Sequence, residues 1–154
     1  MASLLSALRG VVNAAQPLPN LATSGQPRAE QFEALRAAGA EVILDIRDPM
    51  EPRPLDEAEV VRKLGMEYVN VSVRQGALDD STMEAVLAEL RRNRERPVLL
   101  HCASANRVGG VLIPYLILDH AMEEAEAVEI AMRIGLRGPD LLEWGLDYAR
   151  RNSP

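Results

Sequence analysis

The feature that most constrains the fold of this chain is a regular alternation of helical patterns with short apolar runs. Three helical patterns, each followed by an apolar or β-branched run, fill the first two thirds of the sequence. The pairs are residues 28–38 and 42–44, 54–64 and 68–73, and 81–94 and 97–100. Such alternation is typical of parallel strands joined by right-handed helical crossovers. We therefore predict an α/β fold with three layers, in which helices cover both faces of a mostly parallel central sheet.

Turn-forming residues set the expected boundaries of these elements. Pro54 suits the first turn of its helix, and the proline-rich stretch 17–27 is predicted to be irregular. Three further helical patterns, at 108–120, 123–134 and 139–150, close the chain, and Pro114 is expected to bend the first of them. Because no repeat or linker is evident, we predict a single domain over residues 1–154. Within it, residues 1–16 form a surface segment and residues 152–154 a tail.

Composition excludes several classes of function. The net charge is −6 and only 3% of residues are aromatic, which disfavours nucleic acid as the main partner. No apolar stretch is long enough to span a bilayer, and no basic residue precedes the first apolar residues as a secretory signal requires, so we expect a cytoplasmic protein with no membrane partner. A single cysteine excludes an internal disulfide and a multi-thiolate zinc site. The sequence does not indicate an oligomeric state.

One short segment points to chemistry. An apolar run, residues 97–100, ends in His101 and Cys102, and Arg107 follows directly before a helical pattern. Ligands of parallel α/β sheets bind beyond the carboxyl ends of the strands. There the amides of a tight loop and the positive end of a helix can bind an anion, and an arginine adds a two-pronged donor that matches phosphate oxygens. We therefore predict an anion-binding loop around Cys102.

The same electrostatic field would act on the thiol. Cysteines at helix N-termini near Arg or protonated His have pKa values of about 3.5–7.5 instead of about 8.5. We therefore expect Cys102 to be a thiolate at rest and an effective nucleophile, although a lone cysteine is more often an inert core residue.

The motif His-Cys-x4-Arg between a strand and a helix resembles the phosphate-binding loop of the cysteine-dependent tyrosine and dual-specificity phosphatases. With the segments Ala22–Pro27 and Glu41–Arg47, it is most similar to the bacterial beta-lactamase-hydrolase-like phosphatase-like domain, over about residues 9–150. This resemblance implies a phosphatase-like fold that hydrolyses phosphate monoesters without a metal or organic cofactor. The implied substrate is a phosphoprotein, with phosphotyrosine as one option, or a small phosphorylated molecule.

The resemblance also assigns roles. Cys102 becomes the nucleophile that forms a phosphocysteine, Arg107 binds the phosphoryl oxygens, and His101 orients the loop by hydrogen bonding. Gln26 is a weaker candidate for a supporting role. The phosphate-binding amides are those of Ala103, Ser104, Ala105, Asn106 and Arg107.

This loop departs from the common pattern of that superfamily in three ways. Four residues instead of five separate Cys102 from Arg107, so the loop is one residue shorter. The glycine usual inside the loop is replaced by Ala105 and Asn106, of which Asn tolerates a left-handed backbone better. Val108 stands where many members carry Ser or Thr to assist departure of the thiolate.

The general acid is the weakest assignment. Members of the superfamily carry an Asp after the strand that residues 68–73 represent, and here the first carboxylates beyond that strand are Asp79 and Asp80. Both are candidate catalytic acids, although acidic residues at a helix start are also favoured by the helix dipole. Asp45 and Asp48, at the end of another strand, are fallback candidates or partners of Arg47.

Two alternatives stay open. A rhodanese-like sulfurtransferase also places a cysteine in a Cys-x4-Arg loop, and Asp45-Ile-Arg47 superficially resembles its Asp-x-Arg segment, although the Gly-His-Ile that normally follows is missing. A domain that binds phosphate without catalysis would account for the missing general acid. Phosphatase activity is the preferred hypothesis.

Overall fold

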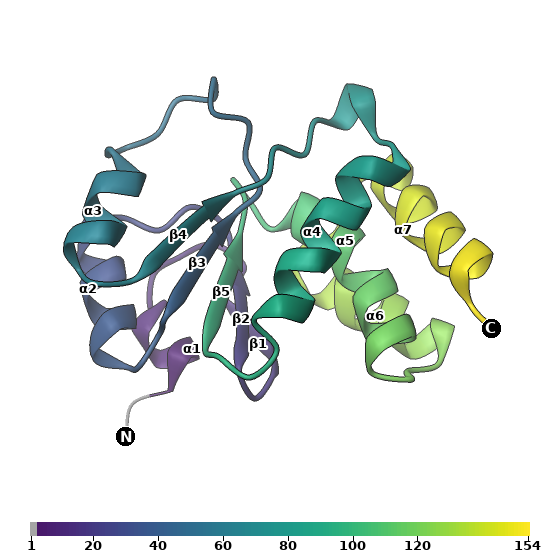
Figure 1. The fold of residues 1–154 in the computed structure, drawn as a ribbon, viewed down its shortest axis with the longest axis horizontal. Helices are drawn as coiled ribbons and strands as arrows, with labels where there is room; N and C mark the ends of the chain where they lie inside the picture. The colour runs from purple at the N-terminus through teal and green to yellow at the C-terminus, as the bar shows by residue number, and fades with distance from the viewer. Residues whose placement is uncertain (1–2) are drawn as a thin grey trace.

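The computed structural model describes residues 3–154 and contains a five-stranded sheet in the order β1-β2-β5-β3-β4. β1 is antiparallel to β2, and the other neighbours are parallel. The strands are β1 (Ala15–Leu18), β2 (Leu21–Ser24), β3 (Val42–Asp45), β4 (Glu67–Asn70) and β5 (Val98–His101). β5 lies between β2 and β3, so its carboxyl end is at the centre of the sheet edge from which the loops of the site arise (Figure 1).

Helices cover both faces of the sheet, as Figure 1 shows. On one face lie α1 (Leu4–Ala7), α2 (Ala29–Ala37) and α3 (Glu57–Lys63). On the other lie α4 (Asp80–Arg92), α5 (Asn106–Pro114), α6 (Glu124–Ile134) and α7 (Pro139–Asn152). A 3-10 turn, η1 (Gln75–Ala77), precedes α4, and a π-helical turn, η2 (Tyr115–Asp119), follows α5. The predicted three-layer α/β fold with a mostly parallel sheet is confirmed.

Alternation along the strands divides the buried side chains between two cores. Leu44, Leu100 and Val111 belong to the core between the sheet and α4–α7. Ile43 and Leu99, one position away on the same strands, belong to the core under α1–α3, together with Phe32. Because both faces of β3 and β5 are covered, these strands are apolar on both sides, which explains why they read as continuous apolar runs.

The stretch 17–27 is not irregular, as the prolines had suggested, because it contains most of an antiparallel hairpin. β2 is completely buried, whereas β1 is the edge strand and is only half-buried. An edge strand tolerates Pro17 because its backbone need not donate on both sides. Residues 3–16 of the predicted surface segment 1–16 are likewise not confined to the surface, since Leu4 and Leu8 are buried against the helices of one face, and residues 1–2 lie outside the described residues.

Other boundaries also differ from the sequence prediction. α3 begins after Asp56, whose carboxylate caps the backbone N–H of Glu59, so Pro54 lies outside the helix. β4 ends at Asn70, short of the predicted 73. The helix predicted over 108–120 begins earlier, at Asn106, and changes at Pro114 into the π-helical turn η2. Proline lacks the N–H that would continue the α-helical ladder.

Within residues 3–154, none of the helices is both long and apolar enough to cross a bilayer. That the whole chain is one domain stays a prediction.

Candidate active site

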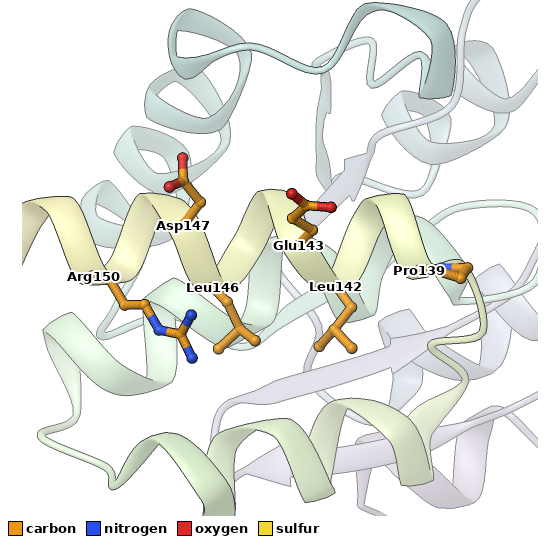
Figure 2. A pocket seen from close by; sticks show the side chains of 6 residues that line it. All are labelled: Pro139, Leu142, Glu143, Leu146, Asp147 and Arg150. Atoms are coloured by element: carbon orange, nitrogen blue, oxygen red, sulfur yellow. The ribbon is translucent and has the colours of Figure 1, made fainter.

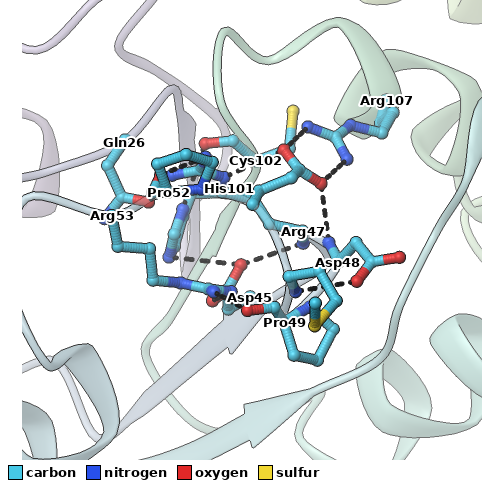
Figure 3. Close-up of polar contacts among 12 residues, drawn as sticks. Gln26, Asp45, Arg47, Asp48, Pro49, Pro52, Arg53, His101, Cys102 and Arg107 are labelled. Atoms are coloured by element: carbon cyan, nitrogen blue, oxygen red, sulfur yellow. Dashed lines mark hydrogen bonds and ion pairs between the residues drawn. The ribbon is translucent and has the colours of Figure 1, made fainter.

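Cys102 lies at the carboxyl end of the central strand β5 and begins the loop that leads into α5. Its backbone N–H donates to the carbonyl of Ser24 at the end of β2, at 3.3 Å, so the loop starts as a continuation of the sheet. The side chain is fully buried, and Figure 3 shows its sulfur directed toward the guanidinium of Arg107. The structure therefore brings together the predicted nucleophile and the predicted phosphate-binding arginine.

Three successive carbonyls of the loop are held by donors from outside it. The carbonyl of Cys102 lies 3.2 Å from Nδ1 of His101, that of Ala103 accepts from the backbone N–H of Gln26 at 3.1 Å, and that of Ser104 accepts from Nδ2 of Asn13 at 2.8 Å. The described peptide bonds are all trans, so each following N–H points opposite to the held carbonyl. The amides of residues 103–105 are thereby turned away from those outside donors, as an anion-binding loop requires.

Ala105 has a left-handed backbone, with φ of 71° and ψ of 4°, and is buried. The expectation that Asn106 supplies this conformation is wrong, because Asn106 is the first residue of α5. The side chain of Asn106 instead accepts two hydrogen bonds at Oδ1, from the backbone N–H groups of Arg137 and Gly138 at 2.7 and 2.9 Å. The shortened loop thus uses an alanine where a glycine would be unstrained, and Asn106 ties it to the segment before α7.

Gly25 packs directly against the backbone of the loop. A Cβ placed on it would lie 2.5 Å from the carbonyl oxygen of Ala103, closer than real Cβ atoms approach. The backbone of Gly25 forms an isolated bridge with Ser104. A side chain at this position would push the loop carbonyl away from the hydrogen bond that orients it.

Arg107 makes a two-pronged ion pair with Glu51, from the segment between β3 and α3. Its Nη1 and Nη2 donate to the two carboxylate oxygens at 2.6 and 2.9 Å, and Nη1 also donates to the carbonyl of Val73 at 3.3 Å. The hydrogen bonds from Arg107 hold the pKa of Glu51 at about 2, although burial opposes the shift. In turn Glu51, and to a lesser extent the neighbouring Cys102, raise the pKa of Arg107.

His101 is buried beneath the loop, and each of its ring nitrogens faces an acceptor. Nδ1 faces the carbonyl of Cys102, and Nε2 lies 2.5 Å from a carboxylate oxygen of Glu57 at the start of α3. Burial alone would lower the pKa of His101, but Glu57 and the more distant Asp45 outweigh it and raise the pKa. The raised pKa favours a doubly protonated ring, which would donate to both acceptors. That His101 orients the loop stays a prediction.

Gln26 belongs to a hydrogen-bonded chain below the loop. Its Nε2 donates to Glu57 at 2.7 Å, and its Oε1 accepts from Nη1 of Arg47 at 2.7 Å. Arg47 also donates from Nε to Glu51 at 3.3 Å and from Nη2 to the carbonyl of Pro52 at 2.8 Å. Gln26 therefore links the partner of His101 to the partner of Arg107.

Asp45, Glu57 and His101 offer ligand atoms that all lie within 4.8 Å of one another, a spacing that could hold a metal ion. Positive charge is already present there, however. Asp45 accepts from Arg53 at 2.6 Å and from the hydroxyl of Tyr68 at 2.7 Å. The contacts of Asp45 with Arg53 and of Glu57 with His101 give these carboxylates partners without a metal ion, so we describe the cluster as a hydrogen-bonded and ion-paired network.

The predicted general acids have other partners. Asp79 caps α4 by accepting the backbone N–H of Thr82 at 2.8 Å, which lowers its pKa. Asp80 forms a two-pronged pair with Arg151, which lowers its pKa as well. Neither aspartate contacts Cys102 or Arg107 in the described chain, so the structure does not bring them to the predicted nucleophile.

The fallback aspartates do not pair with the Arg47 side chain. Asp45 pairs with Arg53 and accepts only the backbone N–H of Arg47, at 2.9 Å. Asp48 pairs instead with Arg74, which follows β4.

An open pocket of about 510 Å³ adjoins the loop on the side of Arg107. It is lined by Asp48, Met50, Glu51, Pro52, Arg74, Gln75 and Arg107. A smaller hollow of about 290 Å³ lies along α7 (Figure 2). Its lining residues, Leu142 and Leu146 among them, come from α7 alone and include no nucleophile. Of these two, only the pocket beside Arg107 adjoins the predicted anion-binding loop.

Sequence reasoning missed Glu51, Glu57 and Asn13. The first two are acidic residues in a region rich in charge, and Asn13 precedes the hairpin that the prolines concealed. The position of Arg47, directly beyond a parallel strand, was the one signal in the sequence that could have pointed to this network of partners.

Known proteins resemble this chain closely in fold but only weakly in sequence. No family model matches the chain, and none of the curated proteins matches it either. Solved structures do match: a DUF442 protein from Shewanella putrefaciens CN-32, designated there as a phosphatase, is 22% identical, with a TM-score of 0.81 over 97% of this chain and 99% of its own. TpbA from P. aeruginosa is 22% identical, with a TM-score of 0.72 over 92% of this chain and 86% of its own. Tk-PTP is 18% identical, with a TM-score of 0.74 over 92% and 98%. The chain therefore has the fold of the cysteine-dependent tyrosine and dual-specificity phosphatases.

Proposed function

We propose that this protein is a cysteine-dependent phosphatase that hydrolyses phosphate monoesters through a phosphocysteine. One observation carries the proposal: Cys102 stands at the start of a loop whose carbonyls are held by outside donors, with Arg107 beside the sulfur. Loop amides that point away from those donors, together with a guanidinium near the sulfur, would form a site for a tetrahedral anion next to a nucleophile.

The reaction proceeds in two steps. The thiolate of Cys102 attacks phosphorus, an S–P bond forms, and the P–O bond to the alcohol breaks with its electron pair leaving on oxygen. Water then attacks the phosphocysteine, which releases inorganic phosphate and restores the thiolate. In both steps Arg107 and the loop amides bind the equatorial oxygens, where negative charge is spread in the transition state.

Binding at Arg107 involves an exchange of partners. Both of its terminal nitrogens donate to Glu51 in this structure, so phosphoryl oxygens that bind these nitrogens take the place of a carboxylate. Because Glu51 keeps contacts with Arg47 and with the backbone N–H of Asp48, at 2.7 Å, it retains donors after that exchange.

When the P–O bond breaks, the oxygen of the leaving alcohol needs a proton unless that oxygen is weakly basic. Of the two predicted acids, Asp79 is the better placed, since it lines a small pocket with Arg74, which also lines the pocket of Arg107. The present contacts of Asp79 lower its pKa, so only a small fraction of it carries the proton that a departing alkoxide needs. We therefore expect aryl phosphates, whose leaving groups are weakly basic, to react far faster than alkyl phosphates.

The substrate class is a phosphorylated protein or small molecule. A cysteine-to-serine variant of TpbA has been solved with phosphotyrosine, and PTPMT1 with PI(5)P, so both classes are bound on this fold. Phosphotyrosine suits the expected preference for an aryl leaving group.

Hydrolysis of para-nitrophenyl phosphate tests the proposal, with Cys102→Ser as the inactive control. We expect release of nitrophenol by the wild type and at least a 100-fold lower rate for the variant. Asp79→Asn and Asp80→Asn, made singly, test the acid with an alkyl phosphate as substrate. Asp79→Asn should slow that reaction while Asp80→Asn spares it, and equal, negligible effects would remove both aspartates from the mechanism.

Two other results would replace the proposal. Transfer of sulfur from thiosulfate to cyanide, without phosphatase activity, would assign the loop to a rhodanese-like sulfurtransferase. Tungstate binding without either activity would indicate a domain that only binds phosphate.

A further inference from the structure

The pocket beside the loop contains a second cation besides Arg107. Arg74, which directly precedes the 3-10 turn η1, lines the same pocket. Its side chain is 63% exposed, whereas the side chain of Arg107 is only 13% exposed. One arginine therefore lies deep at the loop and the other at the solvent-exposed part of the pocket.

Both cations are neutralised by a single turn of the chain. Asp48 pairs with Arg74, and Glu51 pairs with Arg107. The turn is closed by hydrogen bonds from the backbone N–H of Glu51 to the carbonyl of Asp48, at 3.0 Å, and from the backbone N–H of Asp48 to the Glu51 carboxylate, at 2.7 Å. Two carboxylates on one hydrogen-bonded turn thus pair with two arginines that line the same pocket, and a substrate with two linked anionic groups would meet the same two cations.

We propose that Arg74 is a specificity residue that binds a second anionic group of the substrate, while the phosphate undergoing hydrolysis binds Arg107. The inference rests on the proposed function and deepens it. The preferred substrate is a phosphate monoester with a further carboxylate or phosphate.

Replacing Asp48 by a substrate anion as the partner of Arg74 costs little free energy. An exposed ion pair contributes roughly 0–1 kcal/mol, because water screens it and two side chains must be held in place. Asp48 has an independent donor, since the backbone N–H of Met50 donates to it at 2.8 Å, and this contact lowers its pKa. Asp48 therefore stays satisfied when Arg74 turns to a substrate anion.

The pocket also has room for the group that joins the two anions. At about 510 Å³ it falls within the usual size of small-ligand pockets, roughly 300–1,000 Å³, and is more than a lone phosphate needs. Met50, 87% exposed on the rim, supplies an apolar surface between the arginines and solvent. An exposed methionine can adapt to an aryl or alkyl linker.

A matched pair of substrates tests the inference: 4-(carboxymethyl)phenyl phosphate and its carboxamide, which differ in one charge but hardly in size or leaving group. We expect kcat/KM of the wild type to be about 5-fold higher for the carboxylate, as one exposed ion pair of about 1 kcal/mol allows. In Arg74→Gln the ratio should fall to about 1, because the substrate carboxylate then loses its cation. Arg150→Gln is the control, because Arg150 is equally exposed and pairs with Glu124 on another face.

Binding to the Cys102→Ser variant, measured by calorimetry, supplies a second readout that needs no turnover. The carboxylate ester should bind more tightly than the carboxamide, and this difference should vanish when Arg74→Gln is added. Equal kcat/KM for the two esters, or a preference that survives Arg74→Gln, would overturn this inference alone. Failure of the wild type to hydrolyse either ester would overturn the proposed function and the inference with it.

Discussion

Glu51 occupies both terminal nitrogens of Arg107, with oxygen–nitrogen distances of 2.6 and 2.9 Å. These are the donors that a guanidinium presents to phosphate. The pKa of about 2 means that Glu51 is ionised at every pH at which an enzyme of this kind would be assayed. The resting site therefore contains an internal anion at the position where the substrate is expected to bind.

Replacing Glu51 by Gln should tighten the binding of oxyanions. The variant removes a negative charge next to the incoming anion. The neutral amide that it introduces also competes less strongly than the Glu51 carboxylate for the donors of Arg107. We expect the Kd for orthovanadate, measured by calorimetry, to fall about 3- to 10-fold, equivalent to about 1 kcal/mol. Glu143→Gln, in the hollow along α7, makes the same change in net charge at a distance. Weaker vanadate binding in Glu51→Gln would show that Glu51 acts by holding Arg107 in place.

The pair of His101 and Glu57 should make stability depend on pH. The pKa of His101 in the folded protein lies above its ordinary value of about 6.5, so the folded state binds the extra proton more tightly. Its contribution is complete below pH 6.5 and is lost as the pH rises through the folded-state pKa. In Glu57→Gln the carboxylate that raises the pKa of His101 is gone, so burial of the ring lowers this pKa with less opposition. We therefore expect this variant to lose about 2–3 kcal/mol of unfolding free energy at pH 6, and less at pH 9.

Urea denaturation at the two pH values measures this difference. Glu59→Gln is the matched control, because Glu59 lies on the same helix but is exposed and pairs with Lys63. A loss in Glu57→Gln that is the same at pH 6 and pH 9 would rule out a protonated His101 in the folded protein.

Gly25→Ala should reduce anion binding by the loop more than it reduces the stability of the fold. The added Cβ meets the carbonyl of Ala103, which must move, and the amide of Ser104 turns with it. We expect at least a 10-fold loss of vanadate affinity and a cost of about 1–3 kcal/mol in stability. Gly76→Ala is the control, since nothing lies within 4 Å of its Cβ position. Unchanged vanadate affinity in a folded Gly25→Ala protein would mean that the loop does not depend on this close approach.

The local patterns of the sequence were sufficient to predict the three layers of the fold and to place the His-Cys-x4-Arg motif between a strand and a helix. Helix-strand alternation predicted the sheet, and its carboxyl edge placed Cys102 and Arg107 together, because the strand before the cysteine is parallel and buried. Prediction failed where tertiary context overrides a local preference. Pro17 is accepted in β1 only because that strand is an edge, and Ala105 takes a left-handed backbone that its type disfavours.

What the sequence alone determined was therefore the fold class and the position of the candidate nucleophile, Cys102, close to Arg107, since periodicity and close spacing act between neighbours in the chain. What only the tertiary structure decided was the set of partners: Glu51 on Arg107, Glu57 on His101, and Asn13 and Gly25 against the loop. These contacts join residues up to 91 positions apart. Many acidic and amide side chains in the sequence could have made them equally well, and packing of the two helical layers on the sheet selected which ones did.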